Sequence, residues 1–553
     1  MTKERIYQER FSAVRQFFNS ETLYVNFCNP WSRCREDGKS FPFSVSGSAG
    51  LPAAGAMTLR TVFTAESKGV LLLGVGSSRH FKVFCNKVFC FSNEGEGKLY
   101  DLPAPENHPF LVPVVKGENI LEIELAPGRR SDYFCCRPLE KSALKLPVLL
   151  FHPLVTRIAR DEATLVCRTA GAVGCGIQYR KKEESSWQML WDHRGGLIHR
   201  RALHKFFLKN LEEEREYLYR IVMIDPRDPD VKRFSKTFSF KTAPALSRGN
   251  YSFFFTADPQ FEPAVQRDLL KGVFEAGKAA ECDFLVLGGD INSRYSQSRI
   301  ERDLLHTVEK YGNPAAPLLM LRGNHELRGP EPDNFVDFWG GEDDKTFYMF
   351  RYGDTAFLVL DAWENRPSDH PRAKYYSRHN LDEVIKEEEK AFVVQAVNSP
   401  LWRSARRRIV FSHGCSFSQR DRAGTMYRFI QELTDEYFEG EKPVSPLHLF
   451  LAGHTHIYTR SCPGSDEICA FAMPPFPDKS GKGYIFPAVS CCGPNKKGLP
   501  QLSGVRVDAF ENGDLKVRSF LPDGGCFEEF IIHEDHAVEE IISLPHFIPV
   551  EEE

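Results

Sequence analysis

The 553-residue sequence has no apolar run near the roughly 18 residues that a membrane-spanning helix needs. It also lacks any Cys-x-x-Cys pair among its fifteen cysteines, an odd number, which argues against a cysteine zinc site and a disulfide framework. The first ten residues carry charge where a secretory signal has an apolar run of about 7–15 residues. We therefore expect free thiols, no membrane partner and a cytoplasmic location.

An excess of charge of one sign is also missing. The chain has 71 basic and 75 acidic residues, a net charge of −4, and no basic stripe. This excludes the electrostatic footprint of a nucleic-acid-binding protein. A composition of 42% apolar and 26% charged residues is ordinary for a globular protein, and the length predicts three or four domains.

What the sequence does contain is a series of short apolar runs between residues 253 and 456. Each run ends in a polar side chain, as a strand buried on both faces does when it reaches a loop. The donors at these ends are Asp258 with Gln260, Asp290, Asn324 with His325, His413, and His454 with His456. Because ligands gather at the carboxyl ends of strands in open α/β sheets, we expect one shared site.

The type of donor indicates the kind of site. Carboxylate, amide and imidazole groups together suit Zn, Fe or Mn, and the absence of thiolate argues against a closed structural zinc site. Two ions in one site need a shared carboxylate, for which we assign Asp290, and about three further ligands each. The other donors divide into Asp258, Gln260 and His456 for one ion and Asn324, His413 and His454 for the other.

The ordered motifs Asp-x-Gln, Gly-Asp, Gly-Asn-His-Glu, a lone His and Gly-His-x-His resemble those of the calcineurin-like metallophosphoesterases. The resemblance covers roughly residues 250–525, and a β-domain directly before this region is similar to the layout of purple acid phosphatases. It implies a C-terminal four-layer α/β domain, two divalent or trivalent ions (Fe, Zn or Mn) and a phosphate-ester substrate, with a carbohydrate-linked ester as one candidate.

Two positions depart from the pattern of that family. The family has His two residues after the first Asp, or, in purple acid phosphatases, Tyr three residues after the second. This chain has Gln260 and Ser293 there. A neutral amide oxygen is a weaker ligand than imidazole or phenolate. We therefore expect the ion beside Gln260 to bind less tightly and the protein to lack tyrosinate charge-transfer colour.

The resemblance also implies a mechanism. A hydroxide held between two metal ions, with its pKa lowered to about 7 in favourable zinc sites, attacks the phosphorus. His325 is implied to protonate or stabilise the leaving oxygen, an effect worth roughly 10²–10⁴-fold. Asp258 and Asp290 join the catalytic set because they hold the ions.

Two arginines are candidates for substrate binding. Arg294 lies four residues after Asp290, and Arg328 follows the Gly-Asn-His-Glu run. A guanidinium fork suits phosphate geometry, although an arginine near a loop is more often solvated or paired. Asp361, at a strand end, is expected either to orient a ligand histidine or to cap the next helix. Four histidines without matching spacing are expected to be structural or exposed: His306, His370, His379 and His448.

Two β-rich units precede the metal motifs. Residues 1–146, with a turn at Asn86-Lys87, resemble the jelly-roll accessory domains of bacterial glycosidases. Residues 147–243 resemble a fibronectin type III or purple-acid-phosphatase N-terminal sandwich. In this second unit Trp187 and Trp191 either fill the core or stack on a substrate. The metallophosphoesterase domain is expected over 250–535, followed by a C-terminal tail over 536–553.

Within the expected catalytic domain, helical spacing predicts helices over 263–280, 296–311, 381–397 and 424–438, and a hairpin over 346–361. Three functions remain open at this stage. The first is a two-metal phosphoester hydrolase. The second is a non-catalytic glycan- or polymer-binding protein with a weakened metal site. The third is a phosphoprotein phosphatase, which Arg294 favours but the preceding β-domains do not.

Overall fold

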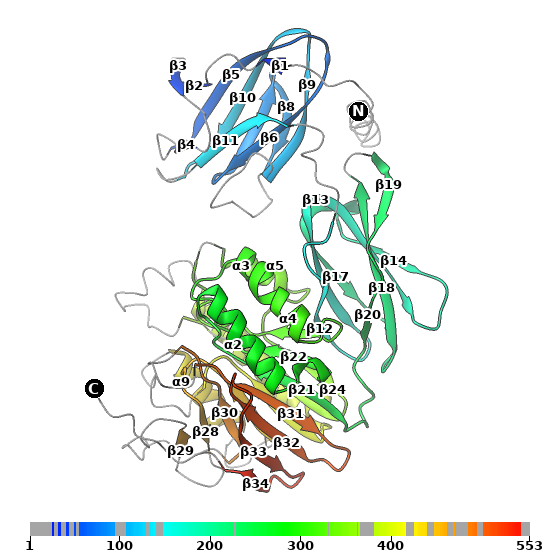
Figure 1. Cartoon of the computed structure of the whole chain (residues 1–553), viewed down its shortest axis with the longest axis vertical. Coiled ribbons are helices and arrows are strands. Elements are labelled where there is room, and N and C mark those ends of the chain that lie inside the picture. The colour runs from blue at the N-terminus through cyan, green and yellow to red at the C-terminus, as the bar shows by residue number, and fades with distance from the viewer. Residues whose placement is uncertain are drawn as a thin grey trace, which may run out of the picture.

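In the computed structural model, three groups of sheets follow one another along the chain (Figure 1). The structure describes residues 55–93, 107–128, 133–139, 148–225, 228–329, 331–361, 363–364, 381–415, 425–438, 447–461, 468–470, 485–494 and 501–543, and the short strands at 25–26, 31–34, 40–43 and 49–50. Residues 365–380, which include His370 and His379, and residues 416–424 lie outside the described part of the chain.

The N-terminal unit consists of two antiparallel sheets, ordered β3-β2-β5-β10-β7-β8, with β1 beside β5, and β4-β11-β6-β9. Its strands are β1 (Val25–Asn26), β2 (Trp31–Cys34), β3 (Ser40–Phe43), β4 (Ala49–Gly50), β5 (Met57–Ala65), β6 (Gly69–Ser77), β7 (Phe81–Cys85), β8 (Val88–Ser92), β9 (His108–Val114), β10 (Gly117–Leu125) and β11 (Tyr133–Pro138). Alternate residues of β5, β7 and β10 are buried in one core between the sheets. Asn86 and Lys87, with φ of 50° and 67°, form the turn of the β7–β8 hairpin, as their sequence predicts.

The second unit is organised by one long strand, β13, which pairs with β12 and β17 in its first half and with β14 and β18 in its second. Its strands are β12 (Leu154–Ile158), β13 (Ala163–Lys181), β14 (Gln188–Trp191), β15 (His193–Arg194), β16 (Leu197–Ile198), β17 (Arg200–Leu208), β18 (Glu216–Asp225), β19 (Asp228–Phe234) and β20 (Phe238–Lys241). Trp187 and Trp191 are half-buried. The guanidinium groups of Arg180 and Arg220 lie over the Trp187 ring, so this ring belongs neither to the core nor to an open stacking surface.

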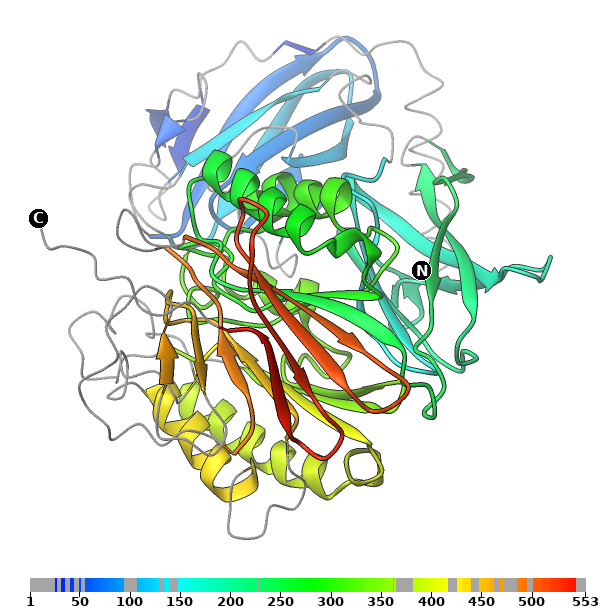
Figure 2. The same ribbon diagram turned by 60° about the horizontal axis from the view of Figure 1, so that its bottom comes forward.

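Two seven-stranded sheets form the third group (Figure 2), with the orders β23-β22-β21-β31-β32-β33-β34 and β24-β25-β26-β27-β30-β28-β29. The strands of the first sheet are β21 (Tyr251–Thr256), β22 (Phe284–Leu287), β23 (Leu318–Met320), β31 (Gly504–Ala509), β32 (Leu515–Phe520), β33 (Cys526–Ile532) and β34 (Val538–Ile542). Those of the second are β24 (Tyr348–Tyr352), β25 (Thr355–Val359), β26 (Arg407–Phe411), β27 (Leu449–Ala452), β28 (Thr459–Ser461), β29 (Ile468–Ala470) and β30 (Ala488–Ser490). Strand β34 pairs with β33, so the sheet continues into the segment expected to be a tail.

Helices cover the outer face of each sheet, and a shared core lies between the sheets. The helices are α2 (Pro263–Ala276), η3 (Ala279–Glu281), α3 (Gln297–Arg299), η4 (Ile300–Leu305), α4 (His306–Tyr311) and α5 (Asn334–Trp339) on the first sheet, and α7 (Asp382–Asn398), α8 (Pro400–Arg403), α9 (Thr425–Leu433) and η6 (Thr434–Phe438) on the second. The layers are therefore helices, sheet, sheet, helices. None of the helices in the described part of the chain is long and apolar enough to cross a membrane.

The second β-unit packs against the edge of the first sheet, where β12 contacts β23. Lys205 donates to the carbonyl oxygens of Val336 and Gly340, both at 2.9 Å, at the carboxyl end of α5. Apolar residues of this unit belong to the same core as the space between the two sheets. Since that core crosses the boundary, the second unit supports the two seven-stranded sheets directly.

A buried histidine at the end of the second sheet leads to a prediction on pH. His448 is 1% exposed, its Nδ1 accepts from the Arg408 backbone N–H at 3.3 Å, and its ring lies 4.1 Å from that of His536. Burial first, then the nearby His536, Arg408 and Arg407, lowers the pKa of His448 from 6.5 to about 2. Between pH 2 and pH 6.5, His448 carries a proton in the unfolded chain but not in the folded chain. The buried neutral imidazole therefore does not reduce the unfolding free energy above pH 6.5, but it reduces that free energy as the pH falls below this value.

We therefore expect the unfolding free energy to drop between pH 6 and pH 4, with His448 contributing up to about 1.4 kcal/mol per pH unit. The variant His448→Asn keeps a hydrogen-bond acceptor but does not titrate in this range, so its drop should be shallower by that amount. Urea unfolding at several pH values measures both slopes. Equal slopes for the two proteins would show that His448 does not supply this dependence.

Candidate metal centre

The carboxyl ends of five strands bring the expected donors to one place. Strands β21, β22 and β23 are parallel neighbours in the first sheet, and β26 and β27 are parallel neighbours in the second. The residues that follow these strands are Asp258, Asp290, Asn324, His413, and the pair His454 and His456. Parallel pairing aligns strand ends at one edge of each sheet, and the two edges face each other across the core.

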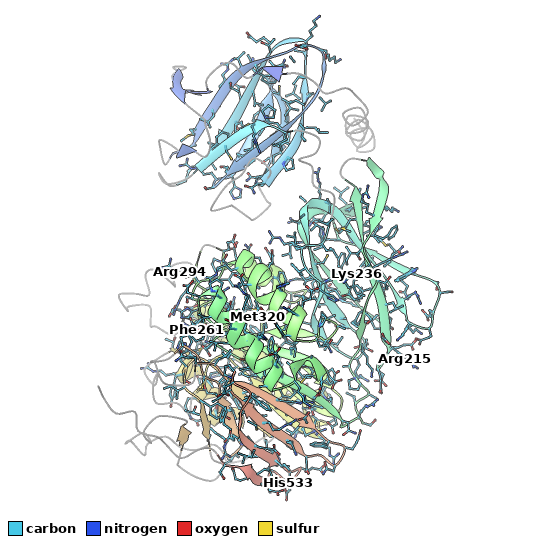
Figure 3. The ribbon with its side chains drawn as sticks, in the orientation of Figure 1. Arg215, Lys236, Phe261, Arg294, Met320 and His533 are labelled. Atoms are coloured by element: carbon cyan, nitrogen blue, oxygen red, sulfur yellow. The ribbon has the colours of Figure 1, made fainter. Side chains whose placement is uncertain are left out.

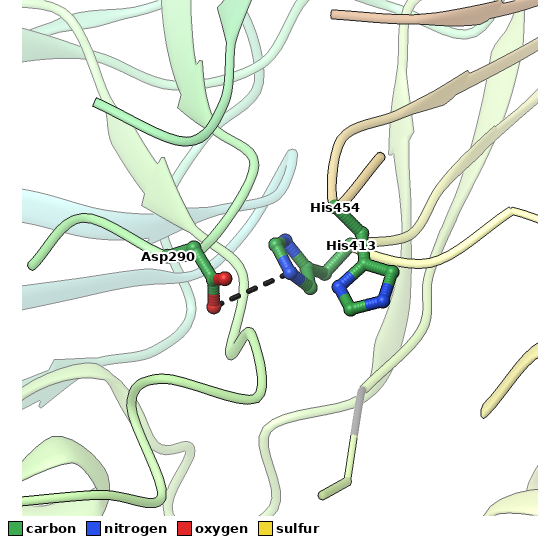
Figure 4. Close-up of side chains that lie close together, drawn as sticks. All are labelled: Asp290, His413 and His454. Atoms are coloured by element: carbon green, nitrogen blue, oxygen red, sulfur yellow. Dashed lines mark ion pairs between the residues drawn. The ribbon is translucent and has the colours of Figure 1, made fainter. Parts of the chain in front are cut away.

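Two groups of ligand atoms lie close enough to hold a metal ion. One consists of Asp290, His413 and His454 and the other of Asp258, Asp290 and His456, and within each group all ligand atoms lie within 4.8 Å of one another. Figure 4 shows Asp290 and His413 joined by an ion pair of 3.3 Å, with His454 beside them. Asp290 is common to both groups, in the position that the sequence predicts for a bridging ligand.

Four of these donor residues have a backbone in the left-handed region, with positive φ angles. The φ angles are 59° at Asp258, 54° at Asp290, 71° at His454 and 60° at His456. Residues other than glycine adopt this region rarely and at a cost of about 1–3 kcal/mol, and such strain clusters at functional sites. The backbone conformation therefore serves to aim the four side chains inward.

The donor atoms fit a metal ion. Within the described part of the chain, Asn324 Oδ1 is buried and has no hydrogen-bond partner. Asp258 Oδ1 and His413 Nε2 are also buried, and their ionic partners, His456 and Asp290, belong to the same donor groups. A buried polar atom of this kind costs about 1–3 kcal/mol unless another partner is present. Carboxylate oxygen, amide oxygen and imidazole nitrogen are the ligands that Zn, Mn and Fe accept.

The charged groups Asp290 and His413 shift each other's pKa. Burial raises the pKa of the Asp290 carboxyl, but His413 and His325 outweigh burial and hold that pKa well below its usual range. In turn, burial lowers the pKa of His413, but Asp290 raises it to about 10. A metal ion that binds His413 would therefore release a proton, so its affinity should rise with pH.

Sequence reasoning assigned no role to Glu326, which the structure places beneath the centre. Its carboxylate is fully buried and accepts from the backbone N–H groups of Asp290, Ile291 and Gly323, all at 2.8 Å. The bonds from Asp290 and Ile291 tie the loop after β22 to the loop after β23, and the bond from Gly323 lies within the second loop. The signal was present in the sequence, because Glu326 is the last letter of the Gly-Asn-His-Glu motif.

His325 is held at both ring nitrogens. Its Nδ1 lies 2.8 Å from the Ser293 carbonyl oxygen, its Nε2 lies 2.6 Å from Arg328 Nη1, and its backbone N–H donates to Asp290 Oδ1 at 2.8 Å. Burial first, and then Arg328, lowers the pKa of His325, although Asp290 opposes them. The imidazole stands 3.7 Å from Asp290 Oδ2, at the edge of the centre.

Arg328, a candidate for substrate binding, lies beside His325 and is paired with a buried carboxylate. Arg328 is 7% exposed, and its guanidinium forms two 2.8 Å hydrogen bonds with Glu364, while Nη1 contacts His325. An arginine committed to a buried carboxylate in this way positions its neighbours. The pair fixes Arg328 beside His325, and a contact of Arg328 with the substrate stays a prediction. Glu364 had no signal in the sequence, since it lies 36 residues from Arg328.

Arg294 remains available as a cation. It is exposed and lies, in Figure 3, on the same side of the catalytic region as Phe261, near the beginning of α2. For Asp361, the structure shows an arginine and a threonine as partners of the carboxylate, and its two expected roles stay predictions. Its carboxylate pairs with Arg322, with Oδ1 2.9 Å from Arg322 Nε, and also accepts from Thr346. The pair ties the loop before Asn324 to the end of β25.

Gln260 lies at the centre, with its side-chain amide in contact with His456. Its side chain is 8% exposed, and its Nε2 lies 2.7 Å from His456 Nε2. Ser293, where a tyrosine would stand in purple acid phosphatases, donates its hydroxyl to the Gln260 carbonyl at 3.3 Å. The two departures from the family pattern are thus in contact with each other.

Comparisons with known proteins give one family match and several similar solved structures. Residues 251–458 match the family model of the calcineurin-like phosphoesterases. Among solved structures, the chain is similar to a purple acid phosphatase from yellow lupin seeds, with 16% identity, a TM-score of 0.46, and coverage of 88% of this chain and 94% of that one. It is also similar to PhoD, with 14% identity, a TM-score of 0.46, and coverage of 72% and 94%.

A third similar structure is the fibronectin type-III domain of a human fibronectin type III domain containing protein, with 15% identity, a TM-score of 0.14, and coverage of 19% and 92%. The comparison with curated proteins found no match. The family match over the segment that carries all five strand ends agrees with the resemblance seen in the sequence. Residues 251–458 therefore match the calcineurin-like phosphoesterase family, in agreement with the motifs of the sequence.

Proposed function

We propose that this chain hydrolyses phosphoric esters at a centre of two metal ions, Fe, Zn or Mn. The observation that carries the proposal is that Asp290 is common to two donor groups whose atoms lie within 4.8 Å, inside the segment that matches the phosphoesterase family. The residues that would hold the ions are Asp258, Gln260, Asp290, Asn324, His413, His454 and His456.

When bound, such ions lower the pKa of water toward neutrality and offset the charge on phosphoryl oxygens. The residues of the chain supply the rest. His325, fixed by the Ser293 carbonyl, assists the leaving oxygen at the edge of the centre. Arg294, exposed on the same side, attracts the phosphate. Glu326 and Arg328 keep the loops and the imidazole in place.

We also assign the two preceding β-units as a jelly-roll-like domain over 1–146 and a fibronectin type III-like sandwich over 147–243, before a catalytic domain over about 250–535. The two-sheet core of the first unit supports the first assignment. The bent strand β13, which joins two sets of partners, supports the second.

The test is hydrolysis of an aryl phosphate monoester and a bis-aryl phosphate by the full chain with added Mn²⁺. We expect turnover of at least one of them. The variant His325→Asn should lower kcat by roughly 10²–10⁴-fold and leave the metal content unchanged, because the imidazole does not hold an ion. Steady-state kinetics and elemental analysis of the same samples measure both quantities.

A protein that carries two ions and hydrolyses neither ester would contradict the proposal. Full activity of His325→Asn would instead remove His325 from the mechanism. Lys386→Gln, on the surface-facing helix α7, serves as the control and should behave as the natural sequence does.

A further inference from the structure

One side of the second β-unit carries aromatic and cationic side chains where a sheet that meets water usually carries polar ones. We call this side the outer face, and it includes Met189, Trp191, Arg220, Lys232 and Phe234 of β14, β18 and β19. Figure 1 shows β14 and β18 on the side of the unit turned away from the two seven-stranded sheets. We propose that the outer face binds an acidic segment of a partner protein that also carries apolar side chains.

The strand registers place these side chains together. Residues paired directly across an antiparallel sheet point to the same side of it. The pairs on the outer face are Gln178 with Met189 and Arg220, Gly176 with Trp191 and Val222, Val222 with Phe234, and Ile224 with Lys232. The residues that alternate with them, such as Ile177, Ile221 and Met223, lie in the core. No carboxylate occurs among these pairs, so this face is apolar and cationic.

The aromatic rings of the outer face hold its cations in place. Arg220 Cζ lies 4.7 Å from the centre of the Trp187 ring and 4.4 Å from the centre of the Phe234 ring. Lys232 Nζ lies 5.5 Å from the centre of the Trp191 ring. A cation in this position is attracted to the face of the ring. The rings therefore keep both charges at defined places on the surface.

No carboxylate of the protein neutralises these two cations. Among the described residues, neither Arg220 nor Lys232 forms an ion pair. Arg220 Nε donates to the neutral amide of Gln178, at 2.8 Å from Oε1, and this leaves the two terminal nitrogens of the guanidinium for a ligand. A guanidinium forms strong hydrogen bonds with carboxylates. The outer face therefore favours a ligand that brings carboxylates.

Exposed apolar surface narrows the class of ligand further. Phe234 is 48% exposed and Met189 is 36% exposed, so the ligand must also bring apolar groups. Nucleobases and sugar rings stack on open aromatic faces, whereas the rings of Trp187, Trp191 and Phe234 each already have a cation over them. Trp, Phe, Met and Arg are instead the residues enriched at the core of protein interfaces. These observations favour an acidic protein segment over a glycan or a nucleic acid.

The experiment uses the full chain and three fluorescent sixteen-residue peptides, with the repeating units Glu-Leu-Glu-Gly, Glu-Ser-Glu-Gly and Lys-Leu-Lys-Gly. Fluorescence anisotropy measures the binding of each peptide. We expect the acidic apolar peptide to bind at least about tenfold more tightly than the other two, because it alone offers both carboxylates and leucines. Raising the NaCl concentration from about 50 mM to about 500 mM should weaken this binding, because salt screens exposed charges.

Single variants locate the contact. Arg220→Gln and Phe234→Ser should each weaken binding of the acidic apolar peptide by about tenfold, because Arg and aromatic anchors carry most of the binding energy at protein interfaces. Arg160→Gln is the matched control, since Arg160 lies in the turn between β12 and β13 and pairs with Glu213 at 3.0 Å. It should bind as the natural sequence does. If circular dichroism shows that Arg220→Gln does not fold, Lys232→Gln replaces it with the same expected loss.

Three results with the peptides would overturn the proposal: no binding of the acidic apolar peptide, equal binding of all three, or binding that none of the outer-face variants weakens. Tighter binding of heparin or of a single-stranded oligonucleotide would also overturn it. So would a dimer in sedimentation velocity that Phe234→Ser dissociates, because a second copy would then occupy the face. The result is independent of the proposed function, since no residue of the outer face belongs to the two metal-donor groups.

Discussion

Replacing Asp290 by Asn is expected to remove both metal ions and to lower kcat by at least about 10³-fold, because each ion supplies several kcal/mol of transition-state stabilisation. Asp290 is 1% exposed and belongs to both donor groups. The asparagine keeps an oxygen for the His325 backbone N–H, which Asp290 Oδ1 accepts at 2.8 Å. The substitution therefore removes the charge and leaves the local hydrogen bond. Elemental analysis and steady-state kinetics on an aryl phosphate measure the two effects.

The control for this variant is Asp268→Asn, an equal change of charge on the exposed face of α2. It should keep both the metal content and the activity. If Asp290→Asn still binds two ions, Asp290 does not bridge them, and the division of the donors into two groups that share it would be wrong.

The second large effect is on stability. Glu326→Leu is expected to lower the unfolding free energy by about 3–5 kcal/mol, because it leaves three buried backbone N–H groups without an acceptor. These belong to Asp290, Ile291 and Gly323. Glu326→Gln keeps one carbonyl oxygen as an acceptor. Its unfolding free energy should therefore lie between that of Glu326→Leu and that of the natural sequence. Urea unfolding with metal present and absent gives the free energies.

An exposed residue provides the comparison. Glu388→Leu, on the solvent face of α7, should change the unfolding free energy by no more than about 0.5 kcal/mol. A loss of under about 1 kcal/mol in Glu326→Leu would mean that water or another group replaces the carboxylate. Glu326 would then not be what ties the two loops together.

The strands and their polar ends could be predicted from the sequence because the signal is local. An apolar run followed by Gly and a donor describes β22 and Asp290, or β27 and His454, without reference to the rest of the chain. The helices α2 and α7 and the hairpin of β24 and β25 were predicted from spacing in the same way. The family match over residues 251–458 confirms the resemblance that these motifs carried.

The partners of the arginines could not be predicted. Arg328 pairs with Glu364 and Arg322 with Asp361, and the members of these pairs lie 36 and 39 residues apart. Such pairs form where loops from different strands meet, and no periodicity in either segment encodes the meeting. The same holds for the contact of Gln260 with His456, 196 residues away. Charged side chains near a site therefore need coordinates before they can be divided between substrate binding and support.

The most direct test of a two-metal centre is the metal content of the full chain after equilibration with Mn²⁺ and removal of the unbound ion. The account predicts close to two ions per chain, falling to near zero in Asp290→Asn. A content of one or less in the natural sequence would contradict it.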